Sequence, residues 1–260
     1  MDGENGKVGI TALTKGYANL NQYDTLIRRN IAIEENCNNP DDFEFVLFHE
    51  GNIPLEHQNH INSKTQIKFK FIDIREIGKA FRDKNHIEFD PETIKFKLNY
   101  RHMCSFWFVD FWHYVEHFSR IVRIDEDCII DFNVDNLMLD LKSYSSIYAY
   151  DFLDIPFLVK GMNDFTLEFL RSKKYKGVKE RDPWGPYTNI IALNLDKLRP
   201  KKIISEYVDA IDKSDCIYIY RWGDLPLWGE VFHYFLESND VKLDKNLVYF
   251  HGSHNQKVNY

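Results

Sequence analysis

Three consecutive acidic residues, Asp125, Glu126 and Asp127, interrupt an apolar run in the segment RIVRIDEDCIIDFN, residues 120–133. Clustered carboxylates repel one another and resist removal from water, so such a cluster usually needs a cation or ample solvent. In an extended segment Asp125 and Asp127 would share one face while Glu126 points away. Hard oxygen ligands favour magnesium or manganese, so the segment predicts a divalent metal site, the alternative being a solvated strand end.

A histidine near the C-terminus is the candidate third ligand. In VYFHGSHN, residues 248–255, His251 directly follows an apolar strand and His254 lies close by. Imidazole binds manganese well and magnesium poorly, so a histidine beside two aspartates favours Mn²⁺ over Mg²⁺. We prefer His251, because the end of the strand fixes its position; the alternative is a histidine of a surface loop.

The segment YRWGDLPLWGEVFHYFL, residues 220–236, contains two candidate catalytic carboxylates, Asp224 and Glu230. Asp224 is expected to cap a helix, and that role alone explains it. An aromatic ring beside a carboxylate is also a common way to bind a sugar, so Trp222 is a candidate platform for a sugar ring. Trp184 and Tyr187, in the loop over residues 173–189, are further platform candidates.

Hydrophobic periodicity predicts strands that alternate with helices. The expected strands cover residues 7–13, 45–48, 67–74, 120–124, 146–152, 190–198 and 245–250, and the expected helices residues 23–33, 53–63, 100–115, 161–174, 201–214 and 224–235. This order indicates an α/β fold with a mostly parallel central sheet, whose ligands bind at the carboxyl ends of the strands.

Composition limits the class of protein. A chain of 260 residues fits one compact domain, and a net charge of -7 argues against a general nucleic-acid binder. Four scattered cysteines predict buried free thiols. We find no apolar stretch near the ~20 residues of a membrane span. We therefore expect a soluble chain, cytoplasmic or, if an N-terminal anchor has been removed, in the Golgi lumen.

Taken in order, these segments resemble the yeast-type Kre2/Mnt1 α-1,2-mannosyltransferases, a family of retaining GT-A glycosyltransferases. The resemblance covers the C-terminal two thirds and is carried by YRHMC at Tyr100–Cys104, RIDED at Arg123–Asp127, YRWGDLP at Tyr220–Pro226 and VYFH at Val248–His251. It implies one GT-A domain over residues 1–260, with a Rossmann-like nucleotide-sugar-binding half, 1–135, and an acceptor-binding half, 136–260.

The resemblance also implies a manganese ion that bridges the donor diphosphate, and GDP-mannose as donor. Asp125 occupies the place of the family's glutamate, Asp127 is the later acid, and His251 completes the coordination. Tyr100 and Arg101 fall where the family approaches the donor.

The remaining donor contacts are expected at the first three strands. Arg101 or Lys15 would add positive charge at the phosphates. The loop after the first strand, with Thr14 and Tyr17, or Asp73 after the third, would contact the nucleoside.

One position departs from the family pattern. Where the family has a glutamate near the anomeric carbon, this chain has Ile191 within TNIIA. Asp224, Asp182 and Glu230 are the carboxylates that could replace it. Retention and inversion of the anomeric centre both stay open, and inversion would need Asp224 or Glu230 as the base for the acceptor hydroxyl.

The sequence thus predicts a metal-dependent glycosyltransferase that moves a hexose from a nucleotide-diphosphate sugar to a hydroxyl of a glycan or glycoprotein, with mannose from GDP-mannose first. The alternatives are a GT-A transferase that uses a UDP-sugar, and a GT-A-like carbohydrate-binding protein without turnover. A nucleotidyltransferase or phosphohydrolase is less favoured, because the chain has no P-loop and no GxGxxG.

Overall fold

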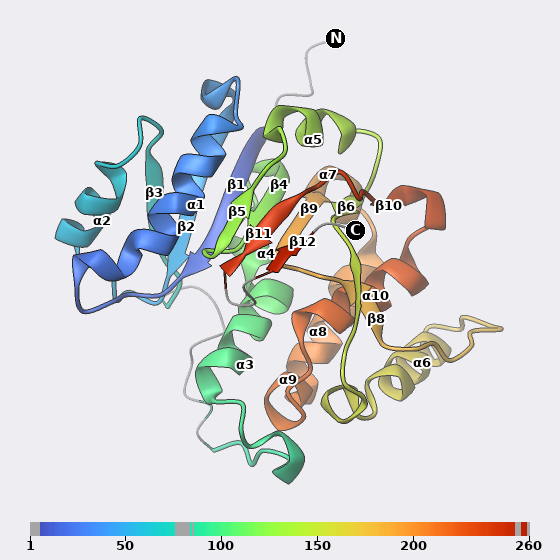
Figure 1. Ribbon diagram of the computed structural model, residues 1–260. Coiled ribbons are helices and arrows are strands. Elements are labelled where there is room, and N and C mark those ends of the chain that lie inside the picture. The colour runs from blue at the N-terminus through green and yellow to red at the C-terminus, as the bar shows by residue number, and fades with distance from the viewer. Residues whose placement is uncertain (1–5, 76–83, 85, 253–255, 259–260) are drawn as a thin grey trace.

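The computed structural model describes residues 6–75, 84, 86–252 and 256–258 (Figure 1). Its strands are β1 (Lys7–Thr14), β2 (Phe43–His49), β3 (Phe69–Asp73), β4 (Phe118–Ile124), β5 (Cys128–Ile130), β6 (Ser146–Tyr148), β7 (Asp151–Leu153), β8 (Trp184–Pro186), β9 (Ile190–Asn194), β10 (Val241–Leu243), β11 (Tyr249–His251) and β12 (Gln256–Val258). Its α-helices are α1 (Asp24–Glu35), α2 (Leu55–Asn62), α3 (Leu98–Ser105), α4 (Phe111–Tyr114), α5 (Val134–Asp140), α6 (Met162–Ser172), α7 (Leu195–Leu198), α8 (Lys202–Ser214), α9 (Cys216–Ile219) and α10 (Asp224–Phe235).

In the part of the chain that the structure describes, the largest sheet has seven strands in the order β10-β6-β9-β4-β1-β2-β3. β3, β2, β1 and β4 run parallel, as do β6 and β10, whereas β9 is antiparallel to both of its neighbours. The prediction of a mostly parallel α/β sheet is confirmed. Because the parallel strands all end at one edge, the residues after β1, β2, β3 and β4 meet there.

Helices cover both faces of this sheet, and two apolar layers result. One layer packs the sheet against α1, α2 and α5; the other packs it against α3, α4 and α6 to α10. Residues alternate between the layers along β4, so Val122 and Ile124 face the first, and Ile121 faces the second. Arg123 shares the face of Ile121, which puts a charged side chain into an otherwise apolar layer.

The two predicted halves contribute strands to the same sheet. In Figure 1 the blue strands β1 and β2 lie on one side of β4, and β9, β6 and β10 lie on the other. The segment 146–152, predicted as one strand, divides in two. β6 stays in the sheet, whereas β7 leaves it and pairs with β8.

A small sheet brings the C-terminal segment to the end of β4. β11 pairs with β5 in antiparallel register, with His251 directly opposite Cys128. The backbone N–H of Gly252 donates to the carbonyl of Asp127 at 2.8 Å and continues this pairing. His251 is therefore fixed beside the acidic turn by backbone hydrogen bonds.

Two further expectations concern the whole chain. Cys37, Cys104 and Cys128 are buried free cysteines and Cys216 is partly exposed, so the prediction of free thiols is confirmed. Across the described ranges, none of the helices has both the length and the hydropathy needed to cross a bilayer.

Candidate metal and donor site

Residues 125–127 form a tight turn between β4 and β5. The backbone N–H of Cys128 donates to the carbonyl of Asp125 at 3.1 Å. The expectation of an extended segment is therefore wrong, and Asp125 and Asp127 do not simply share a face. Each acid of the turn instead has its own neighbours.

Asp127 and His251 are the candidate metal-binding pair at this turn. Asp127 Oδ2 lies 3.5 Å from His251 Nε2, and their ligand atoms and the Cys128 sulfur all lie within 4.8 Å of one another. Two atoms bound to one ion at about 2.1 Å are roughly 3 to 3.5 Å apart, so this pair fits a single divalent cation. A carboxylate and an imidazole suit Mn²⁺ better than Mg²⁺.

Tyr187 orients the imidazole. Its hydroxyl lies 3.4 Å from His251 Nδ1, and the two rings pack edge to face at 5.7 Å between centroids. A partner on Nδ1 leaves Nε2 directed at Asp127, which is how metal-ligating histidines are commonly held. Tyr187, predicted as a sugar platform, therefore lies beside the metal-binding pair.

Arg123 connects two of the predicted acids. Its Nε and Nη2 donate to Asp125 at 2.7 and 3.1 Å, and its Nη1 donates to Asp224 at 2.6 Å. Its guanidinium also lies 4.4 Å from the centre of the Trp107 ring. Burial raises the pKa of Asp125 and the ion pair with Arg123 opposes this rise. Asp125 thus faces Arg123, outside the Asp127–His251 cluster.

Asp224 lies on α10 and reaches Arg123 from there. It is the first residue of that helix, and Gly223 holds the capping position that we predicted for Asp224. Ile191, at the departure from the family pattern, is the direct cross-strand neighbour of Arg123. Neighbouring side chains of such a pair lie on one face of the sheet, so the Asp224 carboxylate reaches the region where the family glutamate was expected.

Sequence reasoning missed the roles of Arg123 and Glu126. Thr14 donates its hydroxyl to Glu126, and Tyr17 does so at 3.3 Å, so Glu126 ties the loop after β1 to the acidic turn. Burial raises the pKa of both Glu126 and Tyr17. The available signal for Arg123 was a charged residue at an inward position of an apolar strand.

The other loops at this edge are packed together. Gly16 donates its N–H to Asn52 Oδ1 at 3.0 Å, which joins the loops after β1 and β2. Lys15 is exposed between them. Asp73, predicted to contact the nucleoside, forms an ion pair with Arg75 at 2.7 Å.

Two candidates lie on α3: Arg101 is fully buried, whereas Tyr100 is partly exposed and interacts with Arg221 and Asp224. Arg101 has 0% of its surface exposed and donates to the backbone carbonyls of Phe96, Thr93 and Tyr218. Its guanidinium therefore supports loops and has no surface for a phosphate. Tyr100 accepts from Arg221 Nη2 at 2.6 Å.

The remaining candidates differ in exposure. Trp222 is 1% exposed and donates its indole N–H to the Lys160 carbonyl, so it belongs to the core. Glu230 is 0% exposed and accepts from Asn163, which removes it from reach of an acceptor. Trp184, on β8, is 44% exposed.

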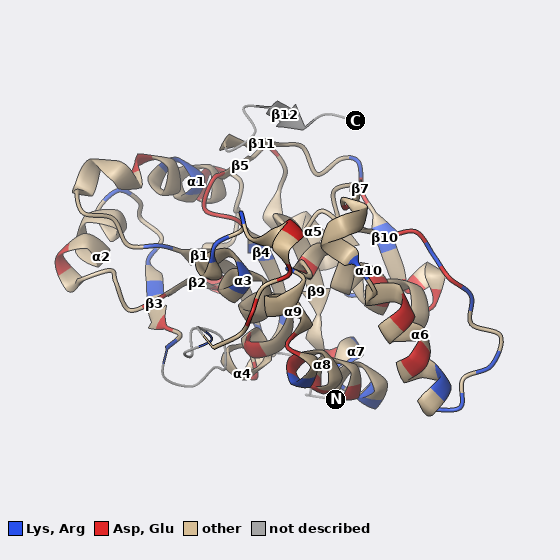
Figure 2. Ribbon diagram, turned by 90° about the horizontal axis from the view of Figure 1, so that it is seen from below, with Lys and Arg blue, Asp and Glu red and all other residues tan. Residues whose placement is uncertain are grey.

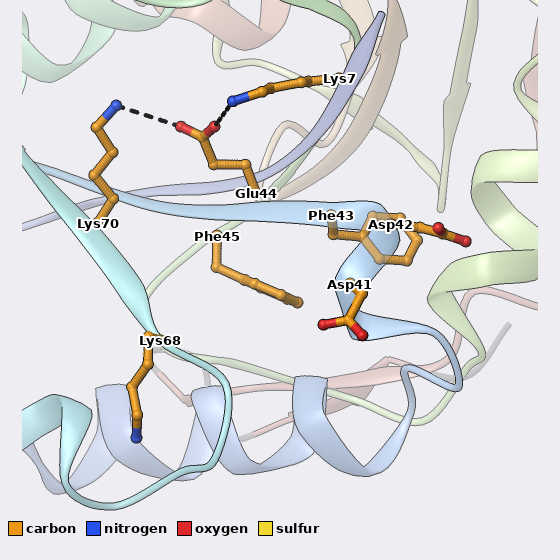
Figure 3. A pocket seen from close by; sticks show the side chains of 8 residues that line it. All are labelled: Lys7, Asp41, Asp42, Phe43, Glu44, Phe45, Lys68 and Lys70. Carbon is orange, nitrogen blue, oxygen red and sulfur yellow. Dashed lines mark hydrogen bonds and ion pairs between the residues drawn. The ribbon is translucent and has the colours of Figure 1, made fainter. Parts of the chain in front are cut away.

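A hollow lies at the opposite end of the strands from the acidic turn. It is lined by charged and aromatic side chains at the starts of β1, β2 and β3 (Figure 3). Glu44 lies between Lys7 and Lys70, at 3.0 and 3.4 Å. These surface ion pairs satisfy the charges locally, and the hollow has no link to the carboxyl ends where Asp127 lies.

The described elements define the GT-A glycosyltransferase fold, a mostly parallel sheet with helices on both faces and an acidic turn after the fourth strand. The mannosyltransferase Ktr4p from Saccharomyces cerevisiae matches with a TM-score of 0.77 and 16% identity, over 95% of this chain and 70% of its own. Core-mannan synthase A (CmsA/Ktr4) from Aspergillus fumigatus, solved in a Mn/GDP form, matches with a TM-score of 0.76 and 15% identity, over 96% and 76%. The fold prediction is confirmed.

A curated relative is similar in sequence. The probable mannosyltransferase KTR3 from Saccharomyces cerevisiae is 26% identical over 170 residues, which are 58% of this chain and 42% of the relative. The chain thus spans less than half of that relative's length. No protein-family model matches the chain.

Proposed function

We propose that the chain is the catalytic domain of a manganese-dependent glycosyltransferase that transfers mannose from GDP-mannose to a hydroxyl of a glycan or glycoprotein. One observation carries this proposal: Asp127 and His251, from opposite halves of the sequence, lie 3.5 Å apart where β4 ends. The similarity to mannosyltransferases, among them a neighbour solved with Mn and GDP, supports mannose and guanosine as the donor's parts.

Each residue of the site has a distinct part in this proposal. Asp127 and His251 hold the manganese, with Tyr187 fixing the imidazole. When bound, the metal stabilises the negative charge that collects on the departing diphosphate. Lys15, exposed in the loop after β1, adds positive charge at the phosphates. Thr14, through Glu126, keeps that loop against the acidic turn.

Asp224 is our candidate for the carboxylate near the anomeric carbon. Both carboxylates are buried, Glu230 with 0% and Asp224 with 4% of its surface exposed, and we choose Asp224 because Arg123 joins it to Asp125 of the acidic turn. Arg123 fixes the orientation of this carboxylate, which acceptor or donor hydroxyls would then meet. Trp184 offers an aromatic face for the acceptor.

The test compares Asp127→Ala with a matched control, Asp131→Ala, an exposed acid beyond β5. We expect Asp127→Ala to weaken manganese-dependent GDP binding at least about a hundredfold, because it removes a ligand. Release of free mannose from GDP-mannose should fall with it. Asp131→Ala should retain both properties, measured by calorimetry and donor hydrolysis.

Other results would change the proposal. Unchanged manganese-dependent binding in Asp127→Ala would remove the metal site. Thermal stabilisation by UDP with manganese, and none by GDP, would reassign the donor to a UDP-sugar. Saccharide binding without donor cleavage would indicate a carbohydrate-binding protein.

A further inference from the structure

Cys128 belongs to the same cluster, but the proposed function does not use it. It is the cross-strand partner of His251, so both side chains leave the small sheet on one face. Its sulfur lies within 4.8 Å of the ligand atoms of Asp127 and His251. A thiol is a poor ligand for manganese, which prefers oxygen and imidazole donors.

With Cys128 included, the three side chains form a ligand set that differs from the one expected for manganese. Thiolate, imidazole and carboxylate are the groups that bind zinc, and three protein ligands with an open fourth position are typical of accessible zinc sites. For a given site, Zn²⁺ also binds more tightly than Mn²⁺. Asp127 remains partly exposed, so an ion can enter from solvent.

We propose that Asp127, Cys128 and His251 bind Zn²⁺ in a site that overlaps the manganese site, so that zinc excludes manganese and inhibits the enzyme. The zinc–sulfur bond forms as the S–H bond breaks, and the proton passes to solvent. The exclusion of manganese rests on the proposed function, whereas zinc binding itself does not.

The distances between the three side chains are close to those needed to bind one zinc ion. Asp127 and His251 are already 3.5 Å apart. Zinc bonds of about 2.0 Å to nitrogen and oxygen and 2.3 Å to sulfur place ligands roughly 3.3 to 3.8 Å apart in a tetrahedron. The Cys128 sulfur and the other two ligand atoms therefore need to approach one another by roughly 1.3 Å at most, a shift shared between the buried thiol and the partly exposed Asp127.

Cobalt provides the direct test, because Co²⁺ bound to a thiolate gives an intense near-ultraviolet charge-transfer band. We expect this band in the wild-type protein and its loss in Cys128→Ser. The control is Cys37→Ser, a buried cysteine on the loop after α1, which should keep the band. Competition with a chromophoric chelator should show zinc affinity at least about tenfold lower in Cys128→Ser, with a smaller fall in manganese affinity.

The outcomes separate the two proposals. Manganese binding is followed by the electron paramagnetic resonance of Mn²⁺, independently of turnover. Manganese binding without a thiolate band in the wild type overturns the zinc site and leaves the proposed function standing, whether or not Cys128→Ser folds. A thiolate band without manganese-dependent GDP binding overturns the proposed function and leaves the zinc site.

Discussion

Arg123 forms ion pairs with two acidic residues of the candidate site, Asp125 and Asp224. Its side chain and that of Asp224 are each 6% exposed, so their charges compensate one another with little help from water. Breaking a buried ion pair by removing one partner costs about 3 to 5 kcal/mol, because the other charge stays buried. Asp125 and Asp224 would also repel each other once the guanidinium is gone.

We therefore predict that Arg123→Met lowers the free energy of unfolding by about 3 to 5 kcal/mol. Arg123→Lys should lower the free energy of unfolding by less, because it keeps the positive charge. Some loss remains, because lysine cannot donate to both carboxylates at once. Adding Asp224→Asn to Arg123→Met should restore part of the loss. Urea unfolding measures all of these, and a fully additive double variant would contradict the coupling.

Glu230 is a buried carboxyl whose environment favours its neutral form. Burial raises the pKa of Glu230, and Thr166, Arg181 and Asn163 only partly oppose this rise. The folded protein therefore holds this proton more tightly than the unfolded chain does. The associated stability is fully present below the ordinary carboxyl pKa and is lost as the pH rises through the raised value.

Glu230→Gln should remove this dependence, because the amide oxygen still accepts from Asn163 and never ionises. The unfolding free energy of the wild type, minus that of Glu230→Gln, should fall as the pH rises above the ordinary carboxyl pKa of 4.5. The control is Glu237→Gln, an exposed residue just beyond the same helix. A difference that stays constant with pH for Glu230→Gln would refute the buried-carboxyl account.

At the scale of elements, two glycines let β8 lie directly on α10. A Cβ built on Gly229 would approach the Trp184 carbonyl at 2.2 Å, and one on Gly185 would approach the Leu225 carbonyl at 2.2 Å. Both obstacles are backbone atoms, which cannot rotate away. β8 in turn leads into Tyr187, so this contact positions the partner of His251.

Gly229→Ala should destabilise the protein by about 2 kcal/mol, although alanine favours a helix interior by about 1 kcal/mol. Hydrogen exchange should also quicken at the amides of Trp184 and Gly185, because β8 moves off α10. Gly161→Ala is the control: it has open space but a positive φ of 70°, so it should cost about 1 kcal/mol and leave β8 unchanged. Equal exchange in both variants would contradict the packing argument.

Charge distribution is also a property of an element. The segment after α6, residues 173–181, is rich in lysine and arginine, although the net charge of the whole chain is -7 (Figure 2). The segment reaches Trp184, the exposed aromatic on β8. Up to β8 this stretch is mostly exposed and has no helix or strand, as expected of a surface loop.

At the scale of the whole molecule, residues 1–135 and 136–260 share one sheet, since β9 pairs with β4 along five residue pairs. Neither half can bury the faces of β4 or β9 alone. We therefore predict one cooperative unfolding transition. Far-ultraviolet circular dichroism and tryptophan fluorescence should give the same urea midpoint, and two separate midpoints would show that the halves unfold independently.

Much of the fold was predictable because hydrophobic periodicity and chain order act locally. The alternation of strands and helices predicted a mostly parallel sheet, and the apolar run before Asp125 correctly placed the acidic motif at the end of a strand. The aromatic segment 100–115 is helical as expected, through α3, a π-helical turn at Phe106–Asp110 and α4. Element boundaries and the split between β6 and β7 were not visible locally, since pairing partners decide where a strand ends.

Sequence alone determined which residues could bind metal, because ligand chemistry belongs to the side chain itself. Only the tertiary structure decided which of these residues lie together. Backbone pairing between β5 and β11 brings His251 to Asp127 and Cys128, whereas Arg123 takes Asp125 and Asp224. Burial likewise assigned Arg101, Trp222 and Glu230 to the core. These outcomes depend on contacts between residues distant in the chain, which residue type and spacing do not specify.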